Sequence, residues 1–596
     1  MNKRINKYKR YLLEWNIKDI TIFAIGVMLF FLLVRRLHYT LSYYDEVLNI
    51  YISYTTVAMG KQHLVDNHWI FSMGDLFNIP FVYVLYKTTG GVEGIVLFLR
   101  YAYLGVNIFL SIIFFSVFHK YLGKSLCVLF SLIFITYAPI SIYSIWYDSA
   151  GLFFLLAGEL LLLGSEMKED KGTNDRLRFF SGVAHACMVY AYPLMILVIL
   201  ILFLGSSFLK IKEDNMALKK LVAYWLPYIM GGVVILFVFV GYVLNVGWEN
   251  VYFFQEHALE SSLSGRIMGD VLTTAGNMRE GSYQEQSTMT LLLGKIGTRV
   301  HSILWCMWEQ QKKTLWVTIV MLIQWSIGLV YKKMIRLILI PEIILVSFFM
   351  HNGTRYWSTT TMYAYYFCWA PFLYFYLENK DKKIGKLLLC ILWGTAIAAL
   401  FSVGFTVAYE TKAHMGLYSG AICTFIFMVL LAKEENFAKL NFAPIVVLLI
   451  AGCNLMIFYN NVYEGAKVSE CNYLMQEGIY KGIMSTEDDV AYEHMAKHLR
   501  KLDLEKDATL YVSSDIYTPA YIEGNLLWSI DLLSIESSLQ LGEEIAGVYD
   551  AKEWPDVIIM GETEREYYPV ILKEIIPEQY EMISSEYGYY MYVKDE

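Results

Sequence analysis

Long apolar blocks alternate with short polar segments over the first 460 residues of this chain. Most blocks span about 17–25 residues, the length that a helix needs to cross a hydrocarbon core of roughly 30 Å. Clear examples are Leu221–Leu244 and Leu387–Ala408. A core helix of a water-soluble protein shows a polar stripe at a spacing of about 3.6 residues, and these blocks show none. The pattern therefore predicts a chain embedded in a membrane.

The blocks predict about thirteen membrane-spanning helices. The stretch Phe179–Leu209 is long enough for one helix, but a break near Tyr192 and Pro193 gives two short spans. We prefer the break because one long helix would place the basic cluster Lys210–Lys220 outside, and the proline, which lacks an amide hydrogen, is consistent with it. The expected bounds are 19–37, 97–118, 125–141, 145–164, 178–191, 193–208, 221–245, 314–331, 335–350, 359–377, 385–408, 416–432 and 442–460.

Lys and Arg residues cluster between alternate spans, and the loops between these clusters hold few of them. Since basic loops stay in the cytoplasm during insertion, we predict that the N-terminus and the clusters are cytoplasmic. Arg35 and Arg36 are an exception at the outer end of the first span, where we expect them at the level of the lipid headgroups. The clusters are Lys3–Arg10, Lys120–Lys124, Lys168–Arg178, Lys210–Lys220, Lys332–Arg336 and Lys380–Lys386.

This orientation places the loops 38–96 and 246–313 and the tail 461–596 outside the membrane. The tail is polar and contains short apolar runs typical of strands, preceded by a helical pattern. We predict an all-α polytopic membrane module over 1–460, which includes both loops, and a small extracytoplasmic α/β domain over 461–596. The expected strands are Ala508–Ser513, Val557–Met560 and Tyr587–Val593, and the expected helix is Asp489–Leu502.

Composition narrows the function classes. The chain is 57% hydrophobic and 17% charged, whereas an ordinary soluble domain has about 25% charged residues. The net charge of −8 and the absence of a basic stripe exclude nucleic acid as an expected partner. Seven of the eight cysteines lie in or beside apolar blocks, which is typical of small buried residues and not of a disulfide framework or zinc site.

Charged residues gather at the predicted outer membrane boundary. Asp45 and Glu46 follow the first span directly, and Asp148 falls at the outer end of the fourth. Arg100 lies at the outer end of the second span and Arg355 in a short outer loop. A charge at this depth is unfavourable and so suggests a functional site. The structural alternative stays open, because arginine can snorkel and an aspartate can cap a helix.

These residue types suit sugar transfer from a phosphate-linked carrier. A carboxylate takes the proton of the incoming hydroxyl and faces an oxocarbenium-like transition state. Arginine suits the departing phosphate because its planar fork donates two hydrogen bonds and stays charged. A carrier with its tail in the bilayer and its headgroup in water would bind at this boundary.

The same residues resemble a family motif. The run from Tyr44-Asp45-Glu46 to Arg100, together with Asp148, resembles the membrane glycosyltransferases of the GT-C fold, most of all the protein O-mannosyltransferases and lipid A aminoarabinose transferases. Thr354-Arg355-Tyr356 resembles their basic-then-aromatic outer loop. The resemblance implies an inverting transferase in which Asp45 is the base and Glu46 supports it. It also implies that Asp148 shapes the cavity and that Arg100 and Arg355 bind the carrier phosphate.

Two departures keep the substrates open. The first loop has Met73–Pro80 where many relatives carry a lysine-proline-proline run, and Tyr190–Tyr192 stands where aminoarabinose enzymes carry a basic residue. Glu256 and His257 in the second outer loop are candidates for contacting the acceptor or, with Asp45, for holding a divalent cation. Loop ordering is the simpler interpretation of that pair, and we expect no required cofactor.

The sequence thus predicts a glycosyltransferase of a plasma membrane. The short basic tail favours a bacterial membrane. Its expected partners are a polyprenyl-phosphate-linked sugar donor, an envelope glycan or lipid acceptor, and membrane lipids. A transporter or flippase of lipid-linked saccharides is one alternative, but it would place ionisable groups near the membrane midplane and repeat its halves. A polymerase or ligase is another, and it would centre on arginines in a large loop.

Overall fold

The computed structural model describes the chain apart from ten long segments, several gaps of one to four residues and Glu596. The predicted residues Arg355, Glu256 and His257 and the side chain of Asp45 lie outside the described part. The long segments without a description are 1–16, 61–73, 249–300, 302–314, 331–338, 347–362, 407–416, 434–441, 529–554 and 562–578.

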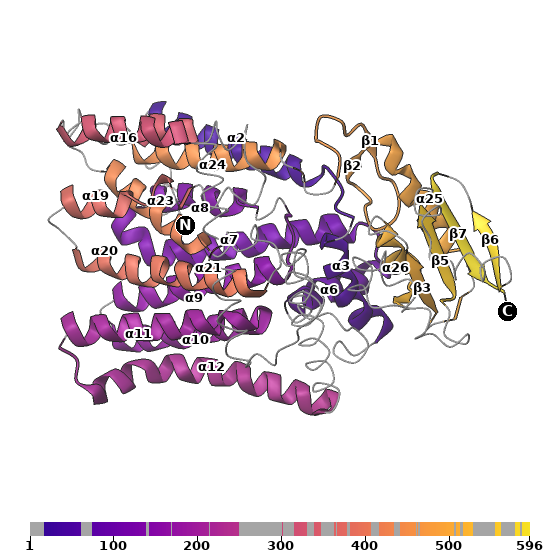
Figure 1. Ribbon diagram of the computed structural model, residues 1–596, viewed down its shortest axis with the longest axis horizontal. Helices are drawn as coiled ribbons and strands as arrows, with labels where there is room; N and C mark the ends of the chain where they lie inside the picture. The colour runs from indigo at the N-terminus through magenta and orange to yellow at the C-terminus, as the bar shows by residue number, and fades with distance from the viewer. Residues whose placement is uncertain are drawn as a thin grey trace, which may run out of the picture.

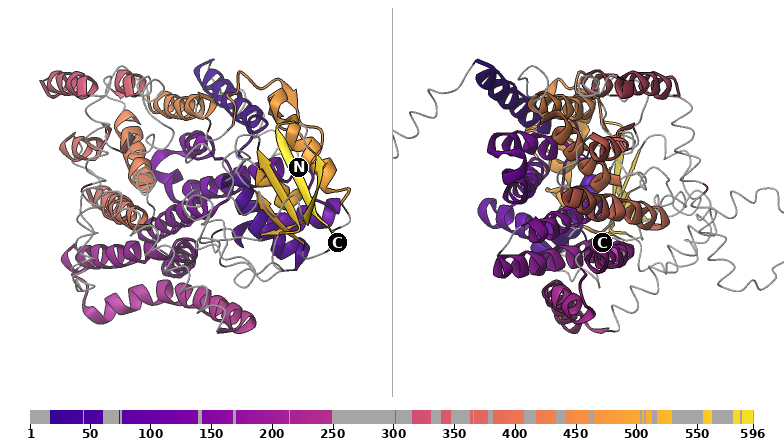
Figure 2. Two further views of the ribbon diagram at one scale, coloured as in Figure 1. Left: turned by 45° about the vertical axis from the view of Figure 1, so that its right-hand side comes forward. Right: turned by 90° about the vertical axis from the view of Figure 1, so that its left-hand side faces the viewer.

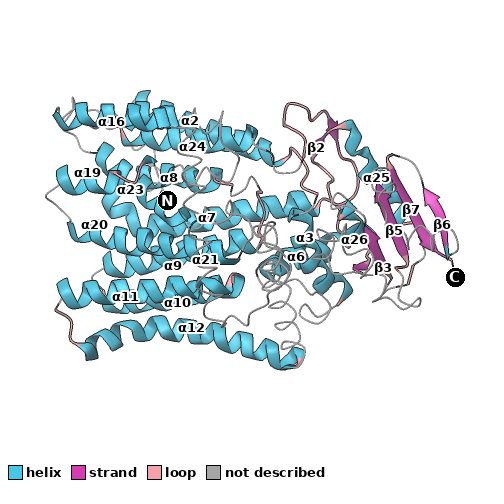
Figure 3. Cartoon of the chain, viewed as in Figure 1, coloured by secondary structure: helices cyan, strands magenta, loops and turns pink. Residues whose placement is uncertain are grey.

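The first 460 residues form a bundle of helices that run side by side (Figures 1 and 3). Each of the thirteen predicted spans coincides with a helical segment in whole or in part, including a short one at 339–346. The helices at these positions are α2 (Ile17–Leu37), α7 (Ile95–Leu122), α8 (Lys124–Thr136), α9 (Tyr147–Met167), α10 (Lys171–Ala191), α11 (Ile196–Glu213), α12 (Leu218–Val246), α16 (Leu315–Val330), α19 (Ala370–Leu377), α20 (Lys382–Leu388), π-helix η6 (Leu389–Trp393), α21 (Gly394–Thr406), α23 (Tyr418–Lys433) and α24 (Ala443–Asn460).

Five of the helices in the described residues are long and apolar enough to cross a membrane: α2, α7, α9, α12 and α24. Four of them, α2, α7, α12 and α24, carry exposed large apolar side chains, such as Phe237 and Leu244 on α12, which are 70% and 77% exposed. An exposed apolar face of this extent is stable in lipid and not in water. The protein is therefore a multi-pass membrane protein, as predicted.

The predicted break at Pro193 is confirmed. Helix α10 ends at Ala191, a 3-10 turn η4 (Pro193–Met195) follows, and α11 begins at Ile196. The chain reverses here, so α11 returns along the bundle and packs against α21.

Two of the predicted clusters contribute described residues, Arg178 and Lys210, that meet at one end of the bundle. Glu166 near the end of α9 binds Lys210 from α11 and lies 3.7 Å from Arg178 of α10. Lys433 at the end of α23 donates to the Tyr121 carbonyl at the end of α7. Three helices, α10, α11 and α23, thus bring basic residues to the same end of the bundle. The orientation of this end toward the cytoplasm stays a prediction.

The first loop folds against the opposite end. It forms α3 (Asp45–Tyr54), the π-helix η1 (Thr55–Met59), a 3-10 turn η2 (Leu76–Asn78) and α6 (Ile79–Thr89). Helix α3 contacts both η2 and α6. Helix α6 starts with Pro80 in its first turn and ends at Gly90, whose φ of +71° is easily adopted by glycine.

The tail forms a small mixed sheet beyond this same end (Figures 1 and 2). Its five strands have the order β4-β3-β5-β7-β6, with β3 parallel to β4 and β5, and β7 antiparallel to β5 and β6. The three expected strands and the expected helix are all present. The elements are β1 (Tyr473–Leu474), β2 (Met484–Ser485), 3-10 turn η8 (Glu487–Asp489), α25 (Val490–Leu499), β3 (Thr509–Val512), α26 (Pro519–Glu523), β4 (Leu527–Trp528), β5 (Val557–Gly561), β6 (Tyr580–Ser584) and β7 (Tyr589–Lys594).

The tail is hydrogen-bonded to the chain that leaves α2. The Met484 amide donates to the His38 carbonyl at 2.6 Å, and the Thr40 amide donates to the Met484 carbonyl at 2.9 Å. The Tyr480 hydroxyl donates to the Ser42 carbonyl at 2.9 Å. These bonds fix the position of the tail relative to the start of α3.

Glycine allows a close crossing of α10 and α12. A Cβ at Gly182 would lie 1.9 Å from the Tyr228 carbonyl oxygen, and one at Gly231 would lie 2.1 Å from the Phe179 carbonyl oxygen. A Cβ at the neighbouring Gly232 would meet nothing within 4 Å. Small residues at helix crossings are a main source of packing in membranes.

We expect Gly231→Ala to destabilise the bundle by about 1–3 kcal/mol, because the added methyl group overlaps backbone of α10. Gly232→Ala is the matched control on the same helix and should leave stability unchanged. Unfolding of the two purified variants in detergent measures the difference. Equal stability of the two variants would show that α10 and α12 are not held by this contact.

A buried carboxylate ties α26 to the rest of the tail. Glu523 accepts from the Ile479 amide at 2.6 Å and from Arg500 at 2.7 Å. Burial raises the pKa of the Glu523 carboxyl above its ordinary 4.5, and Arg500 opposes this rise. A raised pKa means that the folded protein holds the proton more tightly than the unfolded chain. The contribution of Glu523 to the free energy of unfolding therefore falls as the pH rises above 4.5.

We expect Arg500→Leu to make the stability of the protein fall more steeply with pH, because it removes the charge that opposes the rise of the Glu523 pKa. The variant should lose more stability than the wild type when the pH is raised from about 5 to about 8. Adding Glu523→Gln should abolish the extra dependence on pH. Thermal unfolding at several pH values tests this, and parallel pH profiles for Arg500→Leu and wild type would contradict it.

Candidate functional site

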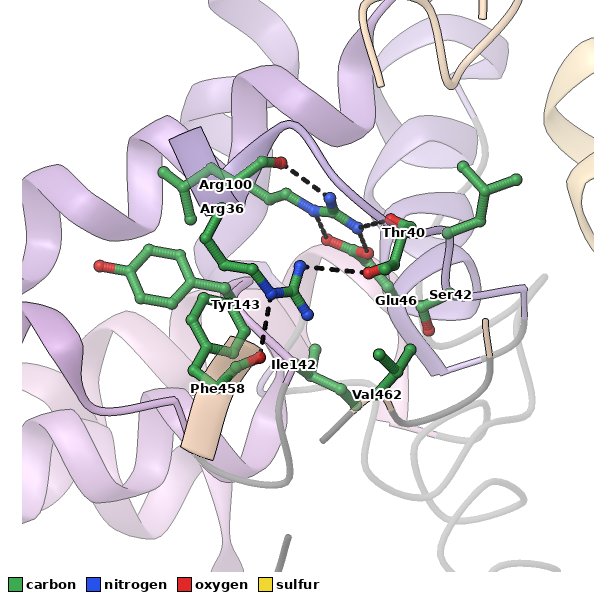
Figure 4. Close-up of a pocket in the computed structure, with 11 residues that line it drawn as sticks. Arg36, Thr40, Ser42, Glu46, Arg100, Ile142, Tyr143, Phe458 and Val462 are labelled. Atoms are coloured by element: carbon green, nitrogen blue, oxygen red, sulfur yellow. Dashed lines mark hydrogen bonds and ion pairs between the residues drawn. The ribbon is translucent and has the colours of Figure 1, made fainter. Parts of the chain in front are cut away.

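A buried ion pair joins the first loop to the second predicted span. Glu46 in the first turn of α3 is 1% exposed, and Arg100 in α7 is 5% exposed. Arg100 binds the carboxylate with two hydrogen bonds, Nε to Oε1 at 3.0 Å and Nη2 to Oε2 at 2.8 Å (Figure 4). Two parallel bonds of this kind fix both position and angle. The pair therefore fixes the start of α3, and with it the backbone of Asp45, against the bundle.

Arg100 also binds the chain that leaves α2. Its Nη1 donates to the carbonyls of Leu37 at 2.8 Å and Tyr39 at 3.2 Å, and its Nη2 donates to the Thr40 carbonyl at 3.0 Å. With the two bonds to Glu46, all five N–H groups of the guanidinium are used. In this conformation Arg100 has no donor left for a carrier phosphate. The geometry gives it a positioning role, and the predicted phosphate contact stays untested.

Arg36 is the member of the site that the sequence reasoning missed. We expected it among the lipid headgroups, but it is 2% exposed and points into the cluster (Figure 4). Its Nε donates to the Phe458 carbonyl at 2.9 Å and its Nη1 to the Tyr39 carbonyl at 2.8 Å. The guanidinium also lies 4.2 Å from the Phe458 ring centre. The neighbouring Arg35 is exposed, as expected of a residue at the headgroups.

Helix ends balance the charge of this cluster. Two arginines face one carboxylate, which leaves one excess positive charge. Leu37 ends α2 and Phe458 lies in the last turn of α24, so their carbonyls have no partner within the helix. Each helix C-terminus carries about half a negative charge. The arginines cap both ends, and the cluster therefore needs no further anion to be neutral.

The cluster also holds a backbone turn that is otherwise unfavourable. Thr40 has a φ of +68°, and a branched side chain rarely adopts this left-handed conformation. Its carbonyl accepts from Arg100, and its hydroxyl accepts from Arg36 at 3.2 Å. Such strain persists where surrounding contacts enforce it, often near a functional site. Here the turn directs the chain from α2 toward α3.

The cavity at this cluster is small. It is lined by Arg36, Glu46, Arg100 and Tyr143, among others, and has a volume of about 20 Å³. This is room for about one water molecule. A sugar ring or a phosphate does not fit. The cluster therefore fixes the position of α3 and is not itself a substrate pocket.

Asp148 lies at the same end of the bundle. It is 2% exposed and occupies the first turn of α9. At the start of the same helix, the Ser149 hydroxyl accepts from the Trp146 amide at 2.9 Å. Asn78 of the first loop donates to the Ile145 carbonyl at 2.5 Å, which ties the start of α9 to η2 beside α3.

The described residues thus bring Glu46 and Arg100 into contact and place Asp148 on a neighbouring element. Asp45 is the first residue of α3, and its side chain lies outside the description. Arg355, Glu256 and His257 also lie outside it, so a metal site at those residues stays a prediction. Within the described part of the chain, no group of three possible metal ligands occurs.

Comparisons with known proteins find solved structures that are similar to this chain. No family model matches the chain, and none of the curated proteins matches it. Two solved structures of ArnT from Cupriavidus metallidurans are similar, one in the apo state and one bound to undecaprenyl phosphate. The similarity covers 96% of this chain and 97% of each ArnT chain, at 10% identity and TM-scores of 0.42 and 0.43. ArnT is a lipid A aminoarabinose transferase, from the branch that the sequence motifs resemble. At this identity the similarity assigns no role to any residue.

We expect Glu46→Gln to destabilise the protein by about 3–5 kcal/mol, because it leaves two buried guanidinium groups without a counter-charge. Glu93→Gln is the matched control. Glu93 is 2.7 Å from Lys481, but its side chain is 44% exposed, and such pairs contribute only about 0–1 kcal/mol. Denaturant unfolding in detergent compares the two, and a loss below about 1 kcal/mol for Glu46→Gln would show that the cluster does not need the carboxylate.

Proposed function

We propose that the protein transfers a sugar from a polyprenyl-phosphate carrier to an acceptor on the outer side of its membrane. The observation that carries this proposal is the buried Glu46–Arg100 pair, directly behind the first residue of α3. It holds the backbone of Asp45 at the boundary between the apolar bundle and the polar tail. A carrier lipid presents its headgroup at such a boundary, so an acid there has access to both substrates.

In the proposed reaction, the Asp45 carboxylate removes the proton of an acceptor hydroxyl as its oxygen attacks the anomeric carbon. The bond from that carbon to the carrier phosphate breaks, and the carrier leaves as polyprenyl phosphate with the bonding electron pair. Attack opposite the leaving group inverts the anomeric centre. Arg355 is the proposed donor to the departing phosphate, since the N–H groups of Arg100 are already used.

The remaining assignments follow the same proposal. Asp148 would shape the cavity beside the first loop. Glu256 and His257 would contact the acceptor or hold a divalent cation, although the chemistry requires no metal. The acceptor would be an envelope glycan or a glycolipid, and less readily a protein. The bundle end with the Glu166 cluster would face the cytoplasm, and the tail would face the outside.

A flippase of lipid-linked saccharides is the second candidate, and one observation favours it. Glu159 on α9 is fully buried within the bundle and accepts from Thr395 of α21. An ionisable group inside a membrane is often part of a transport path. The same bond is also a sufficient structural reason for a buried carboxylate, because Thr395 satisfies one of its oxygens.

We expect Asp45→Asn to abolish sugar transfer while folding and membrane insertion stay intact, because the amide cannot accept the hydroxyl proton. Release of polyprenyl phosphate from polyprenyl-phosphate-linked sugars in proteoliposomes measures it. Glu93→Gln, an exposed carboxylate of the same loop, should retain full transfer. Retention of more than about a tenth of the rate by Asp45→Asn would exclude this residue as the base, and loss of sugar translocation in Glu159→Gln alone would favour the flippase.

A further inference from the structure

A second and larger cavity lies between the first loop and the tail. Its volume is about 250 Å³. One wall is Tyr43, two residues before Asp45 in the sequence, and the other walls come from η8, α25 and the strand β7. The cavity therefore connects the start of the proposed catalytic helix with the outer sheet.

The lining has the chemistry of a carbohydrate site. Five of the nine described lining residues are tyrosines, and none of the nine is Lys or Arg. A sugar ring has an apolar C–H face that stacks on an aromatic ring, and a rim of hydroxyl groups that need acceptors. Two aspartates, Asp488 and Asp489, complete the lining.

The two aspartates have different roles. Asp489 is buried and fixes the walls, since it accepts from the Tyr43 hydroxyl at 2.9 Å and from the Thr486 hydroxyl at 2.9 Å. Asp488 is exposed and forms no hydrogen bond to the described residues. Its carboxylate oxygens are thus free to accept from the hydroxyl groups of a ligand.

Tyr587 is an independent sign of a ligand. Its φ is +58°, a conformation that a bulky side chain rarely adopts, and it immediately precedes Gly588 at +78°. Its ring is 51% exposed and stacks on the His494 ring at 3.9 Å between centroids. Asparagine or glycine would fit this turn without strain. A strained and exposed aromatic residue at the rim of a cavity suggests selection for contact with a ligand.

We propose that this cavity binds one uncharged sugar ring of the acceptor, stacked on Tyr587 with its hydroxyl groups toward Asp488. The assignment to the acceptor rests on the proposed transferase function. The sugar site itself rests only on the cavity. The acidic lining disfavours phosphate and other anions, and the volume lies below the roughly 300 Å³ at which pockets for drug-sized ligands begin. One ring fits such a space, and a lipid or a long glycan does not.

Binding of neutral methyl glycosides and disaccharides to the purified full-length protein tests the proposal. Saturation-transfer NMR on the Asp45→Asn background measures binding without transfer. We expect at least one neutral saccharide to bind. Tyr587→Asn should weaken its binding about fivefold to tenfold, the value of one aromatic stack. The same variant should unfold at an unchanged or higher temperature, because it relieves the left-handed strain.

Met582→Ala is the matched control, since Met582 lies on the adjacent strand β6, is also 51% exposed and does not line the cavity. It should leave saccharide binding unchanged. Asp488→Ala should weaken binding as Tyr587→Asn does. The proposal is overturned if no neutral saccharide binds, if the two cavity variants bind as the control does, or if an oligolysine peptide binds in place of the sugars.

The experiments can reject either proposal without rejecting the other. Absence of saccharide binding, with transfer still lost in Asp45→Asn, would reject the cavity assignment alone. Normal transfer in Asp45→Asn, with saccharide binding still sensitive to Tyr587, would reject the proposed catalytic role and leave the sugar site in place.

Discussion

The arrangement of this protein at the end of the bundle that faces the tail depends on the buried cluster of Arg36, Arg100 and Glu46. Four segments meet there: the end of α2, the start of α3, α7 and the end of α24. The guanidinium groups neutralise one carboxylate and two helix C-termini at once. Because every N–H of Arg100 is used, the contact has one geometry, and it determines where the helix that begins at Asp45 can lie.

Much of the fold was predictable because the membrane restricts the sequence so strongly. Spans must be long and apolar, so the composition of Leu221–Leu244 or Ile445–Tyr459 suffices to locate α12 and α24. Pro193 marked a break because proline lacks the amide hydrogen that a helix interior uses. The strands of the tail were visible for the analogous reason that Val557–Met560 is too apolar to lie outside a core.

Within the described cluster, Glu46 and Arg100 were predictable as residues, but their contacts were not. The positions of Glu46 and Arg100 at one depth followed from span boundaries. The hydrogen bonds from Arg100 to the backbone carbonyls of residues 37–40 did not, because a carbonyl carries no sequence signal. Arg36 was missed for the same reason, since its partner Phe458 contributes a main-chain oxygen 422 positions away. The aromatic lining around Tyr43 joins segments more than 400 residues apart, and only the tertiary structure reveals it.

The short segment 38–42 has a mechanical consequence. One side of it is hydrogen-bonded to the arginines of the bundle, and the other side forms bonds with 480–484 of the tail. Residues 480–484 of the tail are therefore tied to the segment that leads into α3. A displacement of the sheet, such as one caused by occupancy of the cavity at Tyr43, would pull on Thr40 and be transmitted to the first turn of α3. Acceptor capture and alignment of the proposed base would then be a single coupled movement.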